Sequence, residues 1–249
     1  MKIFFCIPAR YKSSRLPGKP LLKINNKTII NHVYENVKKI KNHEKIVILT
    51  DDMRIKNECD RFNATCEIIN EECLNGTDRI IKYLKKKYIT DGIIVNVQGD
   101  EPFINHENIQ KAIDNFIEKK RTNSKMVCSS LYYETDNLDE IKSRSRGKLV
   151  LDKINNVMYC SRNIIPSSKK NEIIENYNYK IHVGIFVFDC EYLLNHYCYE
   201  NTELQLCEDI EWMKILEQGY TMNCVIIDEH EIGVDTILDY EYLKNKYEN

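Results

Sequence analysis

Along the first half of the chain, runs of apolar, β-branched residues alternate with segments whose apolar positions recur every three or four residues. The run at 2–9 predicts a buried strand, and the apolar positions between 29 and 37 predict one face of a helix over 28–40. This alternation is typical of βα units, so we expect an α/β fold with a mostly parallel central sheet flanked by helices. The same criteria predict strands at 45–50, 65–69, 92–98 and 125–133, and helices at 53–62, 76–87 and around 109–116.

The segment 136–181 is less regular than the rest of the chain. Within it, two short apolar runs at 148–152 and 157–160 predict a hairpin around Asn155 and Asn156, and 163–179 predicts a polar loop or a short helix. We expect this excursion to act as a lid or a dimer arm. After it, the pattern predicts strands at 182–189 and 221–227, a helix at 203–218 and a final helix after Asp235.

Composition and charge narrow the class of protein. The 249 residues are 43% hydrophobic and 30% charged, which is ordinary globular usage, and no Gly/Ser/Pro-rich linker divides them, so we predict a single domain over 1–249. A net charge of -2 lacks the basic excess of nucleic-acid-binding proteins. The apolar runs are far shorter than the roughly 20 residues of a membrane span, and no export signal is recognisable. We therefore expect a cytoplasmic protein with neither nucleic acid nor membrane as a partner.

The ten cysteines could indicate a disulfide framework or a metal cluster, but no C-x2-C pair occurs among them. We expect small buried thiols in a reducing compartment. They are Cys6, Cys59, Cys66, Cys73, Cys128, Cys160, Cys190, Cys198, Cys207 and Cys224.

A basic loop follows the first strand, where an open α/β sheet binds its ligands. The sequence has neither G-x-x-x-x-G-K-[ST] nor G-x-G-x-x-G, which disfavours a P-loop or dinucleotide fold. The loop instead carries Arg10, Arg15 and Lys19, whose side chains could clamp a triphosphate. The alternative is a solvated basic loop.

Two aspartates follow later strands. Asp100 comes directly after the buried run Val95-Asn96-Val97-Gln98-Gly99, and Asp235 lies between a predicted strand and the last helix. Mg²⁺ prefers one or two carboxylates together with phosphate oxygens and water, so both are candidate metal ligands. The alternatives are a turn or helix-cap role for Asp100 and the N-cap of the last helix for Asp235.

Taken together, these stretches resemble the CMP-sugar-acid synthetases, and most closely the 3-deoxy-manno-octulosonate (Kdo) cytidylyltransferases. Seven stretches match in order and span almost the whole chain. They are 7–21 with Arg-Leu-Pro-Gly-Lys-Pro-Leu, Gly76-Thr77-Asp78-Arg79, 95–102 with Asn-Val-Gln-Gly-Asp-Glu-Pro, 148–152, 159–162 with Pro166, 182–185, and 233–236.

The resemblance implies a Rossmann-like nucleotidyltransferase fold, usually a homodimer, which transfers CMP from CTP to the anomeric hydroxyl of a 3-deoxy sugar acid, Kdo above all, for lipopolysaccharide or capsule synthesis. Pyrophosphate is released and Mg²⁺ is required. It implies that Arg10, Lys19 and Asp100 are catalytic and that Asp100 and Asp235 hold the metal; whether Asp100 is base or ligand stays open. The nucleotide-binding residues it implies are Pro8, Ala9, Arg10, Arg15, Lys19, Gly76, Thr77, Asp78, Arg79 and Gln98.

For the sugar acid, the resemblance implies binding by His182, Glu208, Glu211 and Arg162. We expect Glu208 and Glu211, three residues apart, to share a helix face. For His182 the alternative is a structural role. Arg162 and Lys148 could each hold the sugar carboxylate or pair with acids elsewhere.

The sugar side also departs from the family pattern. The usual Arg-His-Leu-Gly-Ile-Tyr-x-Tyr-Arg becomes Ile-His-Val-Gly-Ile-Phe-Val-Phe-Asp at 181–189, and a Gln is replaced by Trp212. Phe186 and Trp212 therefore predict an altered acceptor pocket. The acceptor could instead be 8-amino-Kdo, another ulosonic acid or a small phosphonate, and another nucleotide is a further alternative. A silent nucleotide-binding regulator is disfavoured by the intact cations and aspartates.

Overall fold

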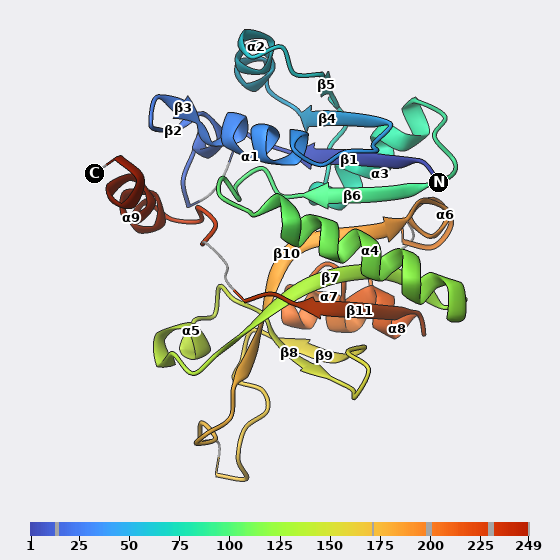
Figure 1. Cartoon of the computed structure of the whole chain (residues 1–249), viewed down its shortest axis with the longest axis vertical. Helices are drawn as coiled ribbons and strands as arrows, with labels where there is room; N and C mark the ends of the chain where they lie inside the picture. Colours follow the sequence, from blue (N-terminus) through green and yellow to red (C-terminus); the bar gives the residue numbers. More distant parts are fainter. Residues whose placement is uncertain (13–14, 171, 198–200, 229–231, 249) are drawn as a thin grey trace.

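The structure, a computed structural model, describes residues 1–12, 15–170, 172–197, 201–228 and 232–248. Ser13 and Ser14 of the basic loop, and Cys198, lie outside the described residues. Figure 1 shows a central sheet with helices on both of its faces.

The central sheet has the strand order β11-β7-β10-β6-β1-β4-β5. β1 pairs in parallel with β4 and β6, β4 with β5, and β7 with β11, whereas β10 is antiparallel to β6, to β7 and to β8. The predicted α/β fold with a mainly parallel sheet is thus confirmed. The strands are β1 (Ile3–Pro8), β4 (Lys45–Thr50), β5 (Cys66–Ile68), β6 (Ile93–Val97), β7 (Met126–Thr135), β8 (Lys148–Leu151), β9 (Val157–Ser161), β10 (Tyr179–Asp189) and β11 (Thr221–Ile226), with a separate pair β2 (Lys23–Ile24) and β3 (Lys27–Thr28).

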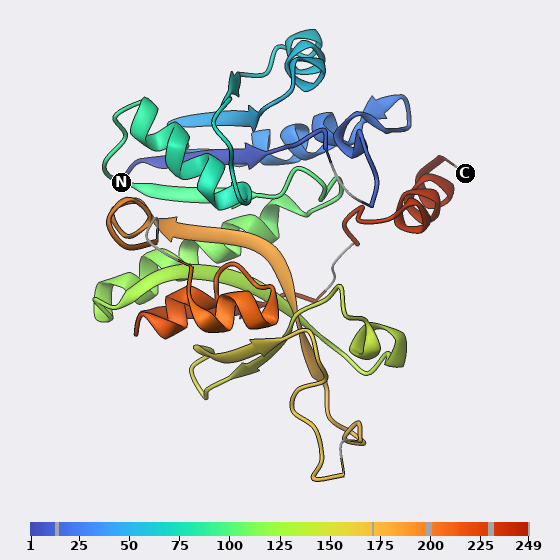
Figure 2. The same ribbon diagram turned by 180° about the vertical axis from the view of Figure 1, so that it is seen from behind.

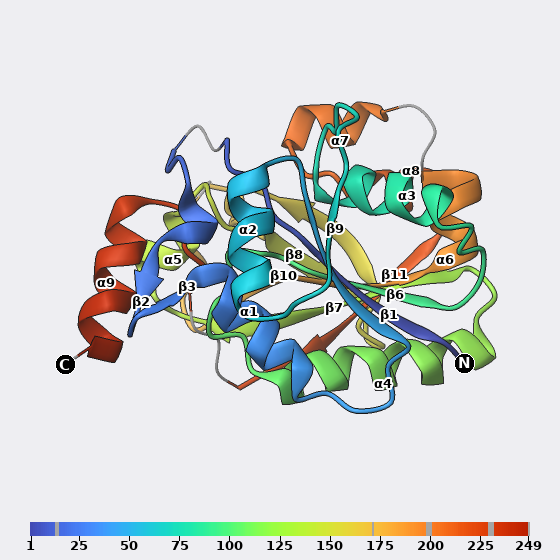
Figure 3. The same cartoon turned by 90° about the horizontal axis from the view of Figure 1, so that it is seen from above.

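Helices cover the two faces of the sheet and enclose two apolar clusters (Figure 3). α1 buries Ile30, Val33 and Val37 with α4 on one face, and α3 buries Ile80 and Leu84 on the other. The helical periodicity of the sequence therefore located the core correctly. The helices are α1 (Ile29–Lys38), α2 (Met53–Arg61), α3 (Gly76–Lys86), α4 (His106–Thr122), α5 (Leu138–Lys142), α6 (Cys190–Tyr192), α7 (Glu203–Glu208), α8 (Met213–Glu217) and α9 (Ile237–Glu248), with η1 (Lys19–Leu21) and η2 (Leu193–Tyr197).

The single helix predicted over 203–218 is wrong. Asp209 has φ 53 and ψ 43, in the left-handed region, and this residue ends α7 before α8 begins. Aspartate tolerates that conformation better than most residues because its short side chain can form local hydrogen bonds. As a consequence, Glu208 and Glu211 do not share a helix face, contrary to the expectation from their spacing.

The excursion projects below the sheet in Figure 2, where β7 and the long, bent β10 continue into it. The predicted hairpin is confirmed: β8 and β9 pair antiparallel, and Asn155 in the turn has φ 64. Between 163 and 178 the described residues form loop and turns without a helix. The excursion therefore widens one end of the sheet.

Seven of the nine described cysteines are buried, none forms a disulfide, and Cys207 is exposed. Within the described ranges, no helix is both long and apolar enough to cross a membrane.

Candidate active site

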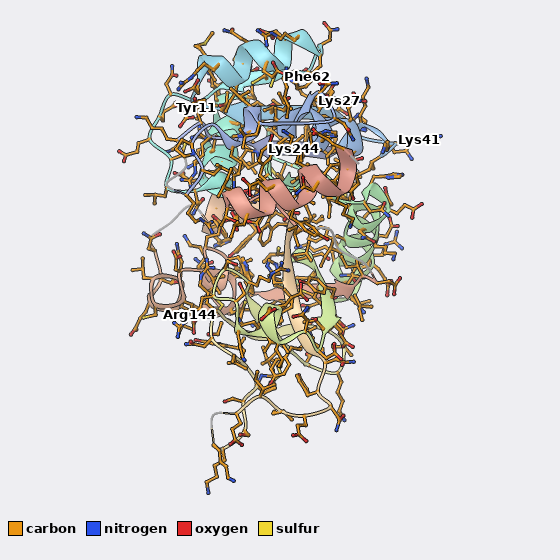
Figure 4. All side chains as sticks on the ribbon, turned by 90° about the vertical axis from the view of Figure 1, so that its left-hand side faces the viewer. Tyr11, Lys27, Lys41, Phe62, Arg144 and Lys244 are labelled. Atoms are coloured by element: carbon orange, nitrogen blue, oxygen red, sulfur yellow. The ribbon has the colours of Figure 1, made fainter. Side chains whose placement is uncertain are left out.

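A cavity of about 720 Å³ opens where the carboxyl ends of β1 and β6 meet the amino-terminal half of β10. Its volume is typical of small-molecule sites. The excursion borders the cavity through Arg146 and Arg162. In Figure 4, Tyr11 of the loop after β1 is labelled in the upper half of the molecule and Arg144 of the excursion in the lower half. Of the predicted site residues, the cavity is lined by Pro8, Ala9, Arg10, Arg15, Lys19, Gly76, Arg79, Gln98, Asp100, Arg162, His182, Glu211 and Asp235.

Two cations and two carboxylates meet at one end of this cavity. Lys19 Nζ lies 2.6 Å from Asp100 Oδ2 and 3.4 Å from Asp235 Oδ1, and Arg15 Nη2 lies 2.9 Å from the same Asp235 oxygen. The Lys19 side chain is only 11% exposed. The loops after β1 and β6 and the segment before α9 thus bring opposite charges together from positions up to 220 residues apart. The alternative of a merely solvated basic loop does not describe Lys19, whereas Arg15 is exposed but paired with Asp235.

Asp235 is not the N-cap of the last helix. The Thr236 hydroxyl accepts from the main-chain N–H of Asp239, and Asp239 Oδ2 accepts from the main-chain N–H of Thr236 at 2.7 Å. This reciprocal pair is a capping box, which satisfies the start of α9 without Asp235. The carboxylate of Asp235 is therefore left to face the cavity and its cations.

A third carboxyl, that of Glu101, also lines this end of the cavity. Burial, together with the nearby charges of Asp100 and Asp235, raises the pKa of Glu101 to about 8. A Cβ on Gly233 would lie 2.9 Å from Glu101 Oε1, so glycine lets the segment before α9 approach without displacing the Glu101 carboxyl. The crowding of acids favours a cation at this end of the cavity.

The donor chemistry fits a hard divalent ion. No group of three or more His, Cys, Asp or Glu residues suited to a metal occurs among the residues the structure describes. A pair of carboxylates is nevertheless what Mg²⁺ takes when phosphate oxygens and water complete its coordination. Asp100 and Asp235, which converge on one ammonium group, provide such a pair.

Two glycines allow a close approach of the loops next to this end. A Cβ on Gly99 would lie 2.8 Å from the main-chain oxygen of Pro8, and one on Gly76 would lie 3.0 Å from Pro8 Cγ. Gly76 is the first residue of α3, whose N-cap is Asn75. The N-terminus of α3 therefore borders the cavity, where its main-chain N–H groups favour an anionic or polar ligand.

The other three residues of the Gly76–Arg79 motif lie behind or beside this wall. Thr77 is fully buried, and Asp78 accepts from the Leu74 main-chain N–H at 3.1 Å and from Lys82 Nζ at 3.1 Å. The Arg79 guanidinium donates to the Ile69 main-chain oxygen at 3.2 Å. Thr77 and Asp78 do not belong to the cavity lining, so they act on a ligand only through their neighbours.

The acceptor side of the cavity has an aromatic wall. The His182 ring lies 5.3 Å from Phe186 and 5.1 Å from Trp212, measured between ring centroids, and all three line the cavity. β10 carries a bulge between Val183 and Phe186, where Ser130 Oγ donates to the main-chain oxygen of Ile185 at 2.6 Å. His182 and Phe186 are four residues apart on this strand, so both lie on the face of β10 that lines the cavity.

His182 and Glu208 also have structural partners. Ser130 Oγ lies 2.9 Å from His182 Nε2, and Glu208 accepts from the Tyr159 hydroxyl at 3.0 Å and from Ser161 Oγ at 2.8 Å. Glu208 does not line the cavity. The carboxylate of Glu208 therefore anchors β9 beneath the site, and any contact with a ligand would require its movement.

Lys148 neither reaches the cavity nor pairs with an acid. Its side chain is fully buried, and Nζ donates to three main-chain oxygens, those of Ser143 at 2.7 Å, Arg146 at 2.8 Å and Arg162 at 2.6 Å. Burial lowers the pKa of Lys148 to about 8. Both alternatives raised for Lys148 from the sequence are thus wrong; the ammonium group instead holds the backbone that presents two arginines.

Both of these arginines line the cavity. Arg162 Nη2 donates to the Asp209 main-chain oxygen at 2.8 Å, and Arg146 Nη1 lies 2.9 Å from Glu140 Oε1 and also bonds the Tyr133 hydroxyl. Arg146 and Tyr133 were not singled out from the sequence. The available signal was the run Ser-Arg-Ser-Arg-Gly at 143–147, a basic turn directly before a short strand.

An α/β sheet with a cavity at the carboxyl ends of its parallel strands, lined by phosphate-binding cations and a carboxylate pair, defines a nucleotide-dependent transferase. The chain belongs to the cytidylyltransferase family, whose model matches residues 4–228. It is a nucleotidyltransferase enzyme.

Individual relatives agree with this assignment. The chain is 36% identical to the 3-deoxy-manno-octulosonate cytidylyltransferase of Protochlamydia amoebophila, over 94% of this chain and 90% of that protein. It is also 36% identical to the enzyme of the same name from Fusobacterium nucleatum, over 98% and 96% of the two chains. A solved CMP:2-keto-3-deoxy-manno-octonic acid synthetase complexed with CTP superimposes with a TM-score of 0.89 at 27% identity, covering 99% of this chain and 98% of that one.

Proposed function

We propose that this enzyme transfers CMP from CTP to the anomeric hydroxyl of a 3-deoxy sugar acid, with Kdo as the principal acceptor, and releases pyrophosphate. The product would serve lipopolysaccharide or capsule synthesis. The observation that carries the proposal is the convergence of Lys19 on Asp100 and Asp235 at one end of the cavity. The names of the relatives support the choice of nucleotide and acceptor.

In this proposal the triphosphate occupies the charged end of the cavity. Arg10, Arg15 and Lys19 bind its oxygens, and Lys19 exchanges its carboxylate partners for phosphate when CTP enters. Because the reaction is an in-line displacement at the α-phosphate, it depends on positioning and charge neutralisation rather than on a covalent nucleophile. Pro8, Ala9, Gly76 and Gln98 would border the nucleoside, and the three residues after Gly76 would hold that wall in place.

Asp100 and Asp235 would hold Mg²⁺, released from Lys19 and Arg15 by the incoming phosphates. When bound, the ion supplies positive charge that stabilises the developing negative charge on the phosphate oxygens.

For the acceptor, we propose that His182 and Glu211 contact the sugar acid and that Arg162 lies near its carboxylate. Arg146, which also lines the cavity, is a second cation for this group. The aromatic pair Phe186 and Trp212 would replace polar contacts to the sugar. Selection of 8-amino-Kdo or another ulosonic acid in place of Kdo is the second candidate, and this apolar wall is the observation that favours it.

We also propose that the chain is one cytidylyltransferase domain that acts in the cytoplasm as a homodimer. The excursion offers a surface for the dimer, because the β8–β9 hairpin exposes Ile154 and Met158 by 63% and 62%. Light scattering on the purified protein measures the mass directly. A monomeric mass at assay concentration would contradict the dimer.

The activity is tested by pyrophosphate release from CTP and Mg²⁺ with Kdo, 8-amino-Kdo, sialic acid or no acceptor. We expect release that depends on Kdo. Release with a different acid alone would move the acceptor and keep the reaction. If CTP binds but no acid causes pyrophosphate release, the proposed transfer is contradicted, and a nucleotide-binding regulator becomes the better hypothesis.

A further inference from the structure

A chain of hydrogen bonds runs behind the cavity from the acceptor wall to the nucleotide wall. The Thr77 hydroxyl donates to Glu211 Oε1 at 2.7 Å, Asn96 Nδ2 donates to the Thr77 hydroxyl at 3.2 Å, and Gln98 Nε2 donates to Asn96 Oδ1 at 3.2 Å. Thr77 and Asn96 are both fully buried and line no part of the cavity, whereas Glu211 and Gln98 both line it. The two cavity residues are thus joined by two polar residues that no ligand can reach.

The direction of this chain is set at its Glu211 end. An ionised carboxylate can only accept, so the Thr77 proton points to Glu211, and the Thr77 oxygen must accept from the amide nitrogen of Asn96. This orients the Asn96 oxygen toward Gln98 and draws the Gln98 nitrogen toward Asn96. Of the two ends of the Gln98 amide, the oxygen is therefore the one left for a ligand. Amide orientations are assigned from hydrogen-bond networks in this way.

Glu211 is well placed to fix this direction. Its main-chain oxygen accepts from the Tyr197 hydroxyl at 3.2 Å, and Lys214 Nζ donates to the Tyr197 main-chain oxygen at 3.2 Å. Burial raises the pKa of the Glu211 carboxyl, while the hydrogen bond from Thr77 and the nearby Lys214 ammonium oppose that shift and favour the ionised form. At the other end, Gln98 packs between two glycines: a Cβ on Gly76 would lie 3.7 Å from its Oε1, and one on Gly184 would lie 3.5 Å from its Cγ.

We propose that Thr77 and Asn96 are positioning residues, which hold the Gln98 amide so that Oε1 faces the cavity and accepts a hydrogen bond from a substrate hydroxyl. This inference rests on the proposed function and assigns a mechanism of selection within it. The hydroxyl belongs either to the ribose of the nucleotide or to the sugar acid, because Gln98 lies between Gly76 on the nucleotide wall and Gly184 on β10. A ligand without that hydroxyl leaves the amide oxygen without a donor.

The test compares the loss caused by removing a substrate hydroxyl in different variants. Binding of CTP, 2′-deoxy-CTP and 3′-deoxy-CTP is measured from the fluorescence of Trp212, the only tryptophan in the sequence, which lies in the cavity. KM and kcat are measured with Kdo and with its 4-deoxy and 5-deoxy analogues. Thr77→Val removes the hydroxyl link, Thr77→Ser retains it, and Gln98→Leu removes the amide.

In the wild type, we expect one of these analogues to bind about 10-fold more weakly than its parent, since one hydrogen bond is lost. The same deletion should cost only about 2-fold in Thr77→Val and in Gln98→Leu, and again about 10-fold in Thr77→Ser, because the two changes remove the same interaction. A nucleotide analogue that behaves so identifies the ribose, and a Kdo analogue identifies the acceptor.

Two outcomes would overturn the inference: an equal penalty in Thr77→Val and the wild type for every analogue, or no penalty for any analogue in the wild type. Thermal melting shows whether Thr77→Val is folded. The ratio of the affinities of a substrate and its deoxy analogue, measured within one variant, does not depend on how much of the protein is active. A wild type that binds CTP but transfers nothing to Kdo would contradict the proposed function, while the nucleotide comparison would still test the hydrogen-bond chain.

Discussion

Replacing Lys148 by methionine tests the support beneath the acceptor side. The methionine keeps the length of the side chain but leaves the main-chain oxygens of Ser143, Arg146 and Arg162 without their shared donor. An unsatisfied buried polar group costs about 1–3 kcal/mol, and part of that loss is offset because the ammonium no longer has to be desolvated. We expect a net destabilisation of about 3 kcal/mol at pH 7. For a chain of this size that lowers Tm by about 9 °C.

The pH dependence gives this prediction a signature of its own. Burial lowers the pKa of Lys148 in the folded protein to about 8, from 10.5. Below pH 8 the folded and unfolded states both hold the proton, so the difference in stability between wild type and Lys148→Met is constant. Above pH 8 the unfolded state alone holds the proton, so the wild type gains stability relative to the variant as pH rises. The gain is about 2 kcal/mol between pH 8 and 9.5.

Urea unfolding of both proteins at pH 7, 8, 9 and 9.5 measures this difference, and tyrosines and cysteines that titrate in both proteins cancel from it. Lys148→Arg is the control that keeps a charged donor. A second readout is KM for the acceptor, which should rise because the backbone of Arg146 and Arg162 is no longer held. A variant as stable as the wild type, or a difference independent of pH, would refute the account of a desolvated ammonium that anchors the site.

The remaining predictions concern the cavity itself. Asp100→Asn should abolish nearly all pyrophosphate release while the melting temperature stays close to that of the wild type. Retained turnover would contradict the assignment of Asp100 to the metal site. The control is Asp91→Asn, a change on the exposed surface. Phe186→Tyr combined with Trp212→Gln should shift kcat/KM toward Kdo over other acids in competition assays, and an unchanged ratio would mean that the aromatic wall does not select the acceptor. Gly99→Ala should lower kcat about 10- to 100-fold, because its Cβ would press on a main-chain oxygen 2.8 Å away and displace the neighbouring carboxylate; unchanged kcat with unchanged Tm would show that the loop adapts.

Much of the fold was predictable because local pattern and tertiary packing agree. The strand at 45–50 and the start of α3 at Gly76 were predicted at their observed positions, since buried β-branched runs and a capped helix start are local signals. The break at Asp209 was not, because a single aspartate is a weaker local stop signal than glycine or proline. The same break separates Glu208 from Glu211, and spacing alone could not reveal that.

The site was predictable to a similar depth. The charged loop and the two aspartates follow strands, and strand ends in a parallel sheet meet at one edge, so the convergence of Lys19 with Asp100 is a consequence of topology. Hydrogen-bond partners that are distant along the chain could not be predicted from the sequence. Nothing local distinguishes Lys148, which serves three peptide oxygens, from a lysine that binds a carboxylate, and nothing local links Thr77 to a glutamate 134 positions away.

The pairing of Arg15 and Lys19 with Asp235 has a consequence for how the protein is made. Synthesis on the ribosome proceeds from the N-terminus, so β1 and its basic loop emerge long before the acid that completes the charged cluster. A nascent or prematurely terminated chain that stops before Asp235 has the cations and Asp100 but lacks the second carboxylate. It also lacks α9, which contacts β2 and lies beside it in Figure 3. If Asp235 holds the metal as proposed, the order of synthesis keeps unfinished chains from acting on CTP until the segment before α9 has been made.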